Sequence, residues 1–116
     1  MNSDAVYLHH ILDATLRIGI YVSVGQEVFM VSPHWQDAVI RQLEVIGEAT
    51  KRLTEETRAA HPYIPWRRVA GLRDVLIHDY RFVDLDETWR VVQDDLPKLE
   101  VQVERILHEL GEPPTA

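Results

Sequence analysis

The 116-residue sequence contains no cysteine, which excludes disulfide bonds, thiolate zinc sites, iron–sulfur clusters and thiol nucleophiles. It also has no long hydrophobic run. Charged or polar residues interrupt every apolar stretch well before the roughly 18 residues that a membrane span needs. The first residues lack the basic start of a signal peptide. We therefore expect a cytoplasmic protein that has no membrane partner.

Basic residues are also scarce, because 12 lysines and arginines face 19 acidic residues and the formal net charge is −7. Such a chain repels polyanions as a whole, so a nucleic acid would need a local basic patch. The length fits one domain, and 46% hydrophobic residues suffice for one core. We expect this single domain to span residues 1–111. Residues 112–116, with two prolines and small side chains, are expected to form a frayed tail.

Apolar residues recur at steps of three and four along most of the chain, which is the pattern of amphipathic helices. Capping residues mark three helix starts, at Ser32 before Pro33, at Thr54 and at Asp84. The sequence predicts helices over residues 3 or 4 to about 22, 33–53, 65 or 66 to about 78, and 85–110, with a short extension at 54–61.

The remaining segments are predicted to connect these helices. Residues 21–31 read as a loop with one short helical turn, because Gly25 interrupts a valine-rich stretch. Pro97 predicts a kink or a restart within the last helix. No convincing pair of strands is present. The pattern therefore predicts an all-α fold, an up-down bundle of four to five helices.

Arginine, histidine and tyrosine gather within eight residues, at Arg73, His78 and Tyr80. Without cysteine, a serine triad or a carboxylate cage, the first two suit phosphate chemistry: a guanidinium holds two phosphate oxygens and an imidazole moves protons. In RNA the 2′-hydroxyl supplies an internal nucleophile, so that cleavage needs no metal.

The spacing alone leaves alternatives open. A regular helix would point Arg73 and His78 about 140° apart. They converge if the helix ends near His78, if the arginine bends across, or if a second copy contributes its own pair. Otherwise Arg73 pairs with an acidic neighbour and His78 completes a helix end.

The run from Arg73 through His78 to Tyr80 resembles the signature of the HepT-like branch of the HEPN superfamily, small helical bundles encoded beside a minimal nucleotidyltransferase. The resemblance covers roughly residues 5–110. Further blocks in the family's order and spacing lie at 43–49, 63–66, 69–73 and 78–80, followed by Trp89.

The resemblance implies a homodimer whose Arg73–His78 pairs face a shared cleft, acting as the toxin of a toxin–antitoxin pair. It implies a metal-independent endoribonuclease without a cofactor, in which Arg73 stabilises the transition state and His78 acts as general acid or base. Tyr80 matches the tyrosine that the partner nucleotidyltransferase modifies with AMP to silence the toxin. The alternative is a non-catalytic helical adaptor that binds the nucleotidyltransferase and accepts nucleotides.

Two acidic residues are candidates for supporting roles. Asp74 stands where many relatives have asparagine, and it would either orient His78 or weaken RNA binding. Glu48 lies among small residues that would let another helix come close. It is either a surface partner of Arg52 or a residue that orients Arg73.

Arg67, Arg68 and Arg81 belong to a possible RNA-binding patch. Acidic residues interleave this patch, so a solvated, salt-bridged surface is equally consistent with it. No metal site is predicted, because the adjacent histidines His9 and His10 diverge on a helix and only Asp13 accompanies them.

Overall fold

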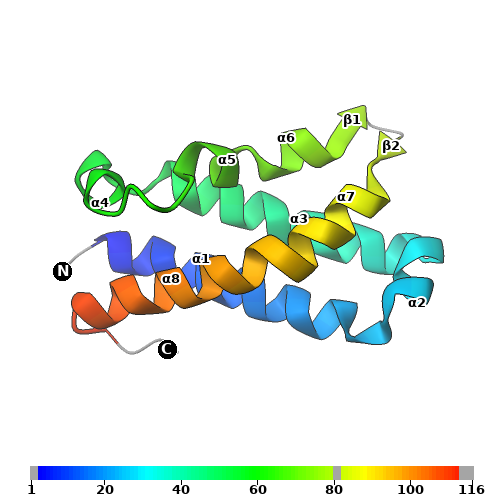
Figure 1. The fold of residues 1–116 in the computed structure, drawn as a ribbon, viewed down its shortest axis with the longest axis horizontal. Helices are drawn as coiled ribbons and strands as arrows, with labels where there is room; N and C mark the ends of the chain where they lie inside the picture. The colour runs from blue at the N-terminus through cyan, green and yellow to red at the C-terminus, as the bar shows by residue number, and fades with distance from the viewer. Residues whose placement is uncertain (1–2, 80–81, 113–116) are drawn as a thin grey trace.

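Three long helices form the frame of the computed structural model: α1 (Ser3–Tyr21), α3 (Pro33–Lys51) and α8 (Leu96–Glu109). They run side by side along the 42 Å long axis of the molecule (Figure 1). The structure describes residues 3–79 and 82–112, and of His78 and Asp79 the backbone alone. Residues 113–116 of the expected tail lie outside the described part. The all-α bundle predicted from the sequence is confirmed.

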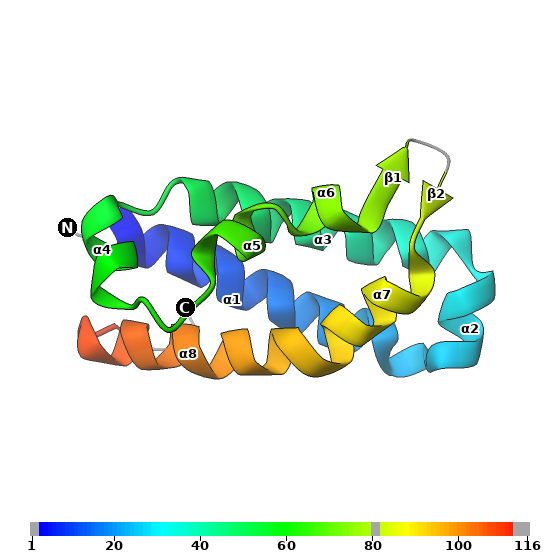
Figure 2. The same cartoon turned by 45° about the horizontal axis from the view of Figure 1, so that its top comes forward.

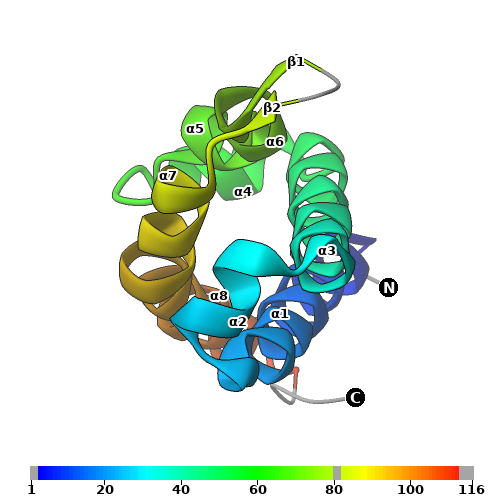
Figure 3. The same ribbon diagram turned by 90° about the vertical axis from the view of Figure 1, so that its right-hand side faces the viewer.

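Shorter elements connect and cover this frame. They are η1 (Val22–Val24), α2 (Gln26–Val31), α4 (Glu55–Ala60), α5 (Trp66–Ala70), α6 (Leu72–Leu76), β1 (Ile77–Asp79), β2 (Phe82–Val83), α7 (Leu85–Arg90) and η2 (Val91–Asp95). Viewed end-on, α5 and α6 lie between α3 on one side and α7 on the other (Figure 3).

The core is built from the apolar stripes of the three long helices and from the side chains that cover them. α1 makes its most extensive contacts with α3 and, next, with α8. Fully buried side chains come from α1, α2, α3, α6 and α8. They are Leu8, Ile11, Ile18, Phe29, Val39, Leu43, Ile46, Leu76, Val103, Ile106 and Leu107. Burying a side chain of this size stabilises the fold by about 1.5–3 kcal/mol.

The three predicted helix caps are present. The Ser32 hydroxyl accepts from the Trp35 amide at 3.5 Å with Pro33 in the first turn, and Thr54 caps α4 in the same way. Asp84 caps α7, accepting from the Glu87 amide at 3.0 Å. Each such cap is worth about 1 kcal/mol.

Two sequence predictions for residues 65–83 are wrong. The helix expected from about 65 to 78 is split at Gly71 into α5 and α6, and it ends at Leu76. A strand pair that the sequence did not reveal follows: β1 pairs antiparallel with β2, with Ile77 opposite Val83 (Figure 2). The Asp84 amide donates to the Leu76 carbonyl at 2.8 Å, so the returning chain satisfies the end of α6.

Residues 21–31 are more helical than predicted. A 3₁₀ turn, η1, and the helix α2 replace most of the expected loop. Gly25 separates them with φ 95°, a backbone conformation that favours glycine. Near Pro97 the C-terminal helix widens into a π turn, η2, in which the Leu96 amide donates to the Val91 carbonyl. The π turn thus shifts the helical hydrogen-bond pattern just before Pro97, a residue that has no amide hydrogen to donate.

Gly47 allows α5 to approach α3 at backbone distance. A Cβ atom built on Gly47 would lie 2.8 Å from the Ala70 carbonyl oxygen, closer than real Cβ contacts. The small-residue block predicted to admit another helix therefore does so, and the helix it admits leads directly into α6.

We expect Gly47→Ala to destabilise the fold by about 1–3 kcal/mol, because the backbone of α5 would have to move. Urea unfolding measures the change. Gly19→Ala is the matched control, since nothing lies within 4 Å of its Cβ position. That control should raise stability by about 0.5–1 kcal/mol. Equal stability of Gly47→Ala and wild type would contradict the close packing.

A buried carboxylate fastens the start of α1 to α4. Asp4 is only 2% exposed. It accepts from the Thr54 amide at 3.0 Å, from the Thr54 hydroxyl at 2.6 Å and from the Thr57 hydroxyl. Burial alone would raise the pKa of Asp4, but these hydrogen bonds outweigh it and hold the pKa below its ordinary value of 3.8.

Because the pKa of Asp4 is lower in the folded state, its stabilisation is present at neutral pH and is lost as pH falls below about 4. Asp4→Asn should lower stability at pH 7 by about 1–3 kcal/mol and flatten the acid limb of the stability profile. Thermal unfolding between pH 7 and pH 2 measures both effects. Asp13→Asn, at an exposed site, should change stability at pH 7 by less than about 0.5 kcal/mol. An unchanged acid limb in Asp4→Asn would refute this role.

Candidate functional site

A groove lies between α3 and the α5–α6 segment, on the side where Figure 3 places these helices next to each other. Its volume is about 260 Å³. Three of the residues singled out from the sequence, Arg73, Asp74 and Glu48, line it together. The full lining is Leu43, Glu44, Gly47, Glu48 and Lys51 from α3, with Ala70, Arg73 and Asp74 opposite.

Arg73 is held in this groove by acidic groups. Its Nε donates to Glu44 Oε1 at 3.1 Å. Its Nη1 lies 3.8 Å from Asp74 Oδ1, an ion pair beyond hydrogen-bond distance. The Arg73 side chain is 48% exposed. The guanidinium is therefore anchored at one edge and open to the groove at the others.

Sequence reasoning missed Glu44. It lies four residues before Glu48, hence on the same side of α3, and this spacing is the one sequence signal that would have drawn attention to it. Its second oxygen, Oε2, lies 3.9 Å from an Arg41 nitrogen. The Glu44 carboxylate thus stands between the guanidinium groups of Arg41 and Arg73.

Glu48 lines the groove but its carboxylate pairs elsewhere. Glu48 Oε1 lies 3.4 Å from Lys51 Nζ, so the surface partner suggested by the sequence, Arg52, is replaced by Lys51. The carboxylate in contact with Arg73 Nε is that of Glu44.

The end of α6 at Leu76 changes the geometry expected for His78. The separation of about 140° applies to a continuous helix, but the backbone of His78 belongs to β1. Between the two candidate catalytic residues the chain is therefore helical to Leu76 and extended from Ile77. The side chain of His78, and Tyr80 and Arg81 altogether, lie outside the described residues.

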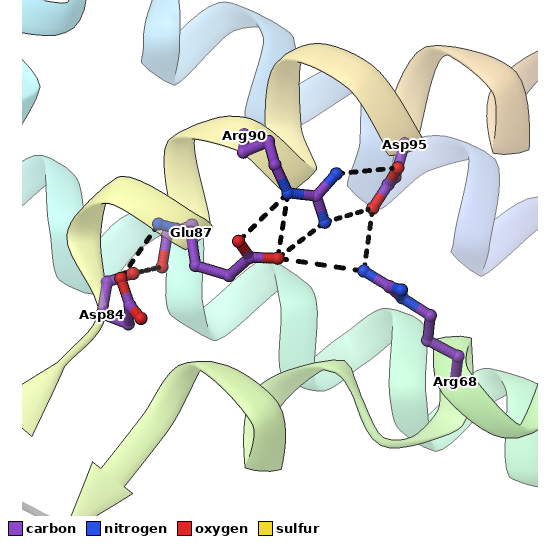
Figure 4. A network of polar contacts seen from close by, with 6 residues as sticks. Arg68, Asp84, Glu87, Arg90 and Asp95 are labelled. Atoms are coloured by element: carbon purple, nitrogen blue, oxygen red, sulfur yellow. Dashed lines mark hydrogen bonds and ion pairs between the residues drawn. The ribbon is translucent and has the colours of Figure 1, made fainter.

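Arg68, one arginine of the predicted basic patch, is paired with acidic groups in a network that also contains Arg90 (Figure 4). Arg90 donates to Glu87 at 2.6–3.0 Å and to Asp95 at 3.2 Å, and Arg68 donates to the same Asp95 at 3.4 Å. The hydrogen bond from Arg90 lowers the pKa of Glu87, and hydrogen bonds to Glu87 and Asp95 raise that of Arg90. This network ties α5 to α7 and η2.

Arg67, the neighbour of Arg68 on α5, has an exposed side chain. Among the described residues it makes no ion pair. Of the arginines on α5 and α6, Arg67 and the outer edge of Arg73 are thus the groups open to an anion, whereas Arg68 is already paired.

Within the described part of the chain, no group of three or more His, Cys, Asp or Glu side chains is arranged to hold a metal ion. No described helix is long and apolar enough to cross a membrane.

Comparison with known proteins identifies relatives over most of the chain. The model of the family described as "Ribonuclease HepT-like" matches residues 11–106. "Probable ribonuclease HepT" of Thermococcus cleftensis is 44% identical over 101 residues, which are 86% of this chain and 92% of that protein. "Putative RNase TTE0752" of Caldanaerobacter subterraneus is 39% identical over 108 residues, covering 92% of this chain and 96% of that protein.

A third relative is longer. The Methanocaldococcus jannaschii protein named "Gamma-glutamylcyclotransferase and putative RNase MJ0434" is 44% identical over 106 residues, but these cover 90% of this chain and only 48% of that protein. This chain therefore spans about half the length of that relative. No solved structure matches the chain. The match over residues 11–106 and the identity to full-length relatives show that this chain belongs to the HepT-like ribonuclease family.

Proposed function

We propose that the chain is an endoribonuclease toxin that cleaves RNA without a metal ion and acts as a homodimer. Two findings support this proposal: membership of the HepT-like ribonuclease family and the open groove that presents Arg73. The observation that carries it furthest is the half-exposed Arg73 guanidinium, anchored by Glu44 and followed, after three more helical residues, by the end of α6.

The chemistry follows from the groups available. The 2′-oxygen of a ribose attacks the adjacent phosphorus, the bond from phosphorus to the 5′-oxygen breaks, and a cyclic phosphate remains. One proton leaves the 2′-hydroxyl and one reaches the departing 5′-oxygen. In this proposal His78 transfers a proton, and Arg73 neutralises the charge that develops on the non-bridging oxygens.

Homodimer formation is part of the proposal because one Arg73–His78 pair supplies a single imidazole. Two pairs facing a shared cleft would supply both an acid and a base. The partner proposed for regulation is a minimal nucleotidyltransferase antitoxin that transfers AMP to Tyr80. The added phosphate would occupy the anion site and repel RNA.

The purified chain should cleave single-stranded RNA in the presence of excess chelator. Arg73→Ala and His78→Ala should each reduce the rate by at least about 100-fold, because each removes a group that acts on the phosphate in the transition state. Gel analysis of labelled RNA, with detection of the cyclic phosphate end, measures this. Sedimentation checks that the variants keep the wild-type assembly. Activity that appears only with added divalent metal would overturn the mechanism.

One observation favours a second candidate, the non-catalytic adaptor. Glu44, Glu48 and Asp74 all line the groove of Arg73, so that a phosphate entering it meets three carboxylates. Added to the overall charge of −7, this acidity opposes RNA binding. An adaptor would need only to bind the nucleotidyltransferase and accept nucleotides.

Measuring both AMP transfer and RNA cleavage distinguishes the nuclease toxin from the non-catalytic adaptor. With the nucleotidyltransferase and ATP, the wild type should gain the mass of AMP and lose its RNase activity, whereas Tyr80→Phe should gain no mass and stay active. Intact-mass spectrometry gives the readout. AMP loading of a wild-type chain that never cleaves RNA would support the adaptor, and loading of Tyr80→Phe would place the modification elsewhere.

A further inference from the structure

We infer that Glu44 is a positioning residue for the phosphate site: it binds the Nε edge of Arg73 and so directs the terminal nitrogens of that guanidinium toward a substrate phosphate. This inference rests on the proposed nuclease function.

The geometry of the contact carries the argument. A guanidinium is planar and carries five N–H donors in a fixed arrangement, so fixing its Nε edge fixes the direction of the others. Glu44 takes Nε at 3.1 Å. The remaining ion pair, from Nη1 to Asp74, is 3.8 Å long and involves a carboxylate that is 78% exposed. The terminal nitrogens therefore remain available for two phosphate oxygens.

Glu44 is partly buried and lies beside a second arginine. Its side chain is 36% exposed, and its other oxygen faces Arg41 at 3.9 Å. One turn along α3, Gly47 touches the backbone of Ala70. Ala70 lies three residues before Arg73. The contact of Gly47 with Ala70 and the contact of Glu44 with Arg73 therefore both attach residues 70–73 to α3.

The sign of the charge makes the role testable. A carboxylate beside a phosphate site repels the substrate, so removing it without losing orientation should strengthen RNA binding. Glu44→Gln keeps an oxygen that accepts from Nε and removes the charge. Glu44→Ala removes both the charge and the anchor. Orientation and electrostatics are thus separated by two variants at one position.

In steady-state cleavage of RNA with chelator, Glu44→Ala should lower kcat by about 10- to 100-fold, as expected when a catalytic group is misplaced by about 1 Å. Glu44→Gln should stay within about threefold of the wild type, and neither variant should raise KM. The matched control is Asp13→Ala, which removes the same type of contact, from Arg17 Nε to Asp13 at 2.9 Å, on the exposed face of α1. It should leave kcat and KM unchanged.

A readout independent of cleavage completes the test. In ¹⁵N NMR spectra the Arg73 Nε–H signal should be slow to exchange in the wild type and in Glu44→Gln, and should be lost in Glu44→Ala. If the wild type does not cleave RNA but the signal behaves in this way, the nuclease proposal fails while the anchoring of Arg73 by Glu44 stands.

Two results would overturn the inference. If the Glu44→Ala variant cleaves RNA as fast as the wild type, or faster, then Glu44 only repels the substrate and does not position Arg73. An Arg73 signal that is identical in Glu44→Ala and wild type would show that Glu44 does not hold the guanidinium.

Discussion

The contact between Gly47 and the Ala70 carbonyl is the constraint on which the candidate site depends. α5 and α6 are each only five residues long, too short to hold a position by their own hydrogen bonds. They are placed by packing on α3, and that packing needs a residue without a Cβ at position 47. Since Arg73 follows Ala70 by only three residues, the same contact determines where its guanidinium meets the groove.

Charge is distributed so that few cations remain available. Two of the five arginines between residues 67 and 90, Arg68 and Arg90, join α5 to α7 and η2 through Glu87 and Asp95. Arg73 is anchored at one edge only. In a chain of net charge −7, the proposed RNA substrate would then meet a few open cations rather than a broad basic face. Recognition of RNA by such a surface would be local and sensitive to salt.

Much of the fold can be predicted from the sequence, because helix caps and helical periodicity are local signals. Ser32, Thr54 and Asp84 all cap helices where their side chains predict it. The end of α6 at Leu76 and the β1–β2 pair cannot be predicted in this way, since they depend on the chain returning to form a hydrogen bond with Leu76. Arg73, Asp74 and Glu48 share one groove, but the pairing of Arg73 with Glu44 depends on the packing of α6 against α3, which no local pattern encodes. Sequence spacing gives the face of one helix and not the residue that faces it.

The central claim is that the groove between α3 and α6 receives a phosphodiester on Arg73. A crystal structure with a single-stranded oligonucleotide whose 2′-hydroxyls are replaced by hydrogen, which cannot be cut, tests it most directly. The account predicts a backbone phosphate about 2.7–2.9 Å from the terminal nitrogens of Arg73, with Glu44 still bound to Nε. An oligonucleotide bound on another face, with the Arg73 groove empty, would contradict it.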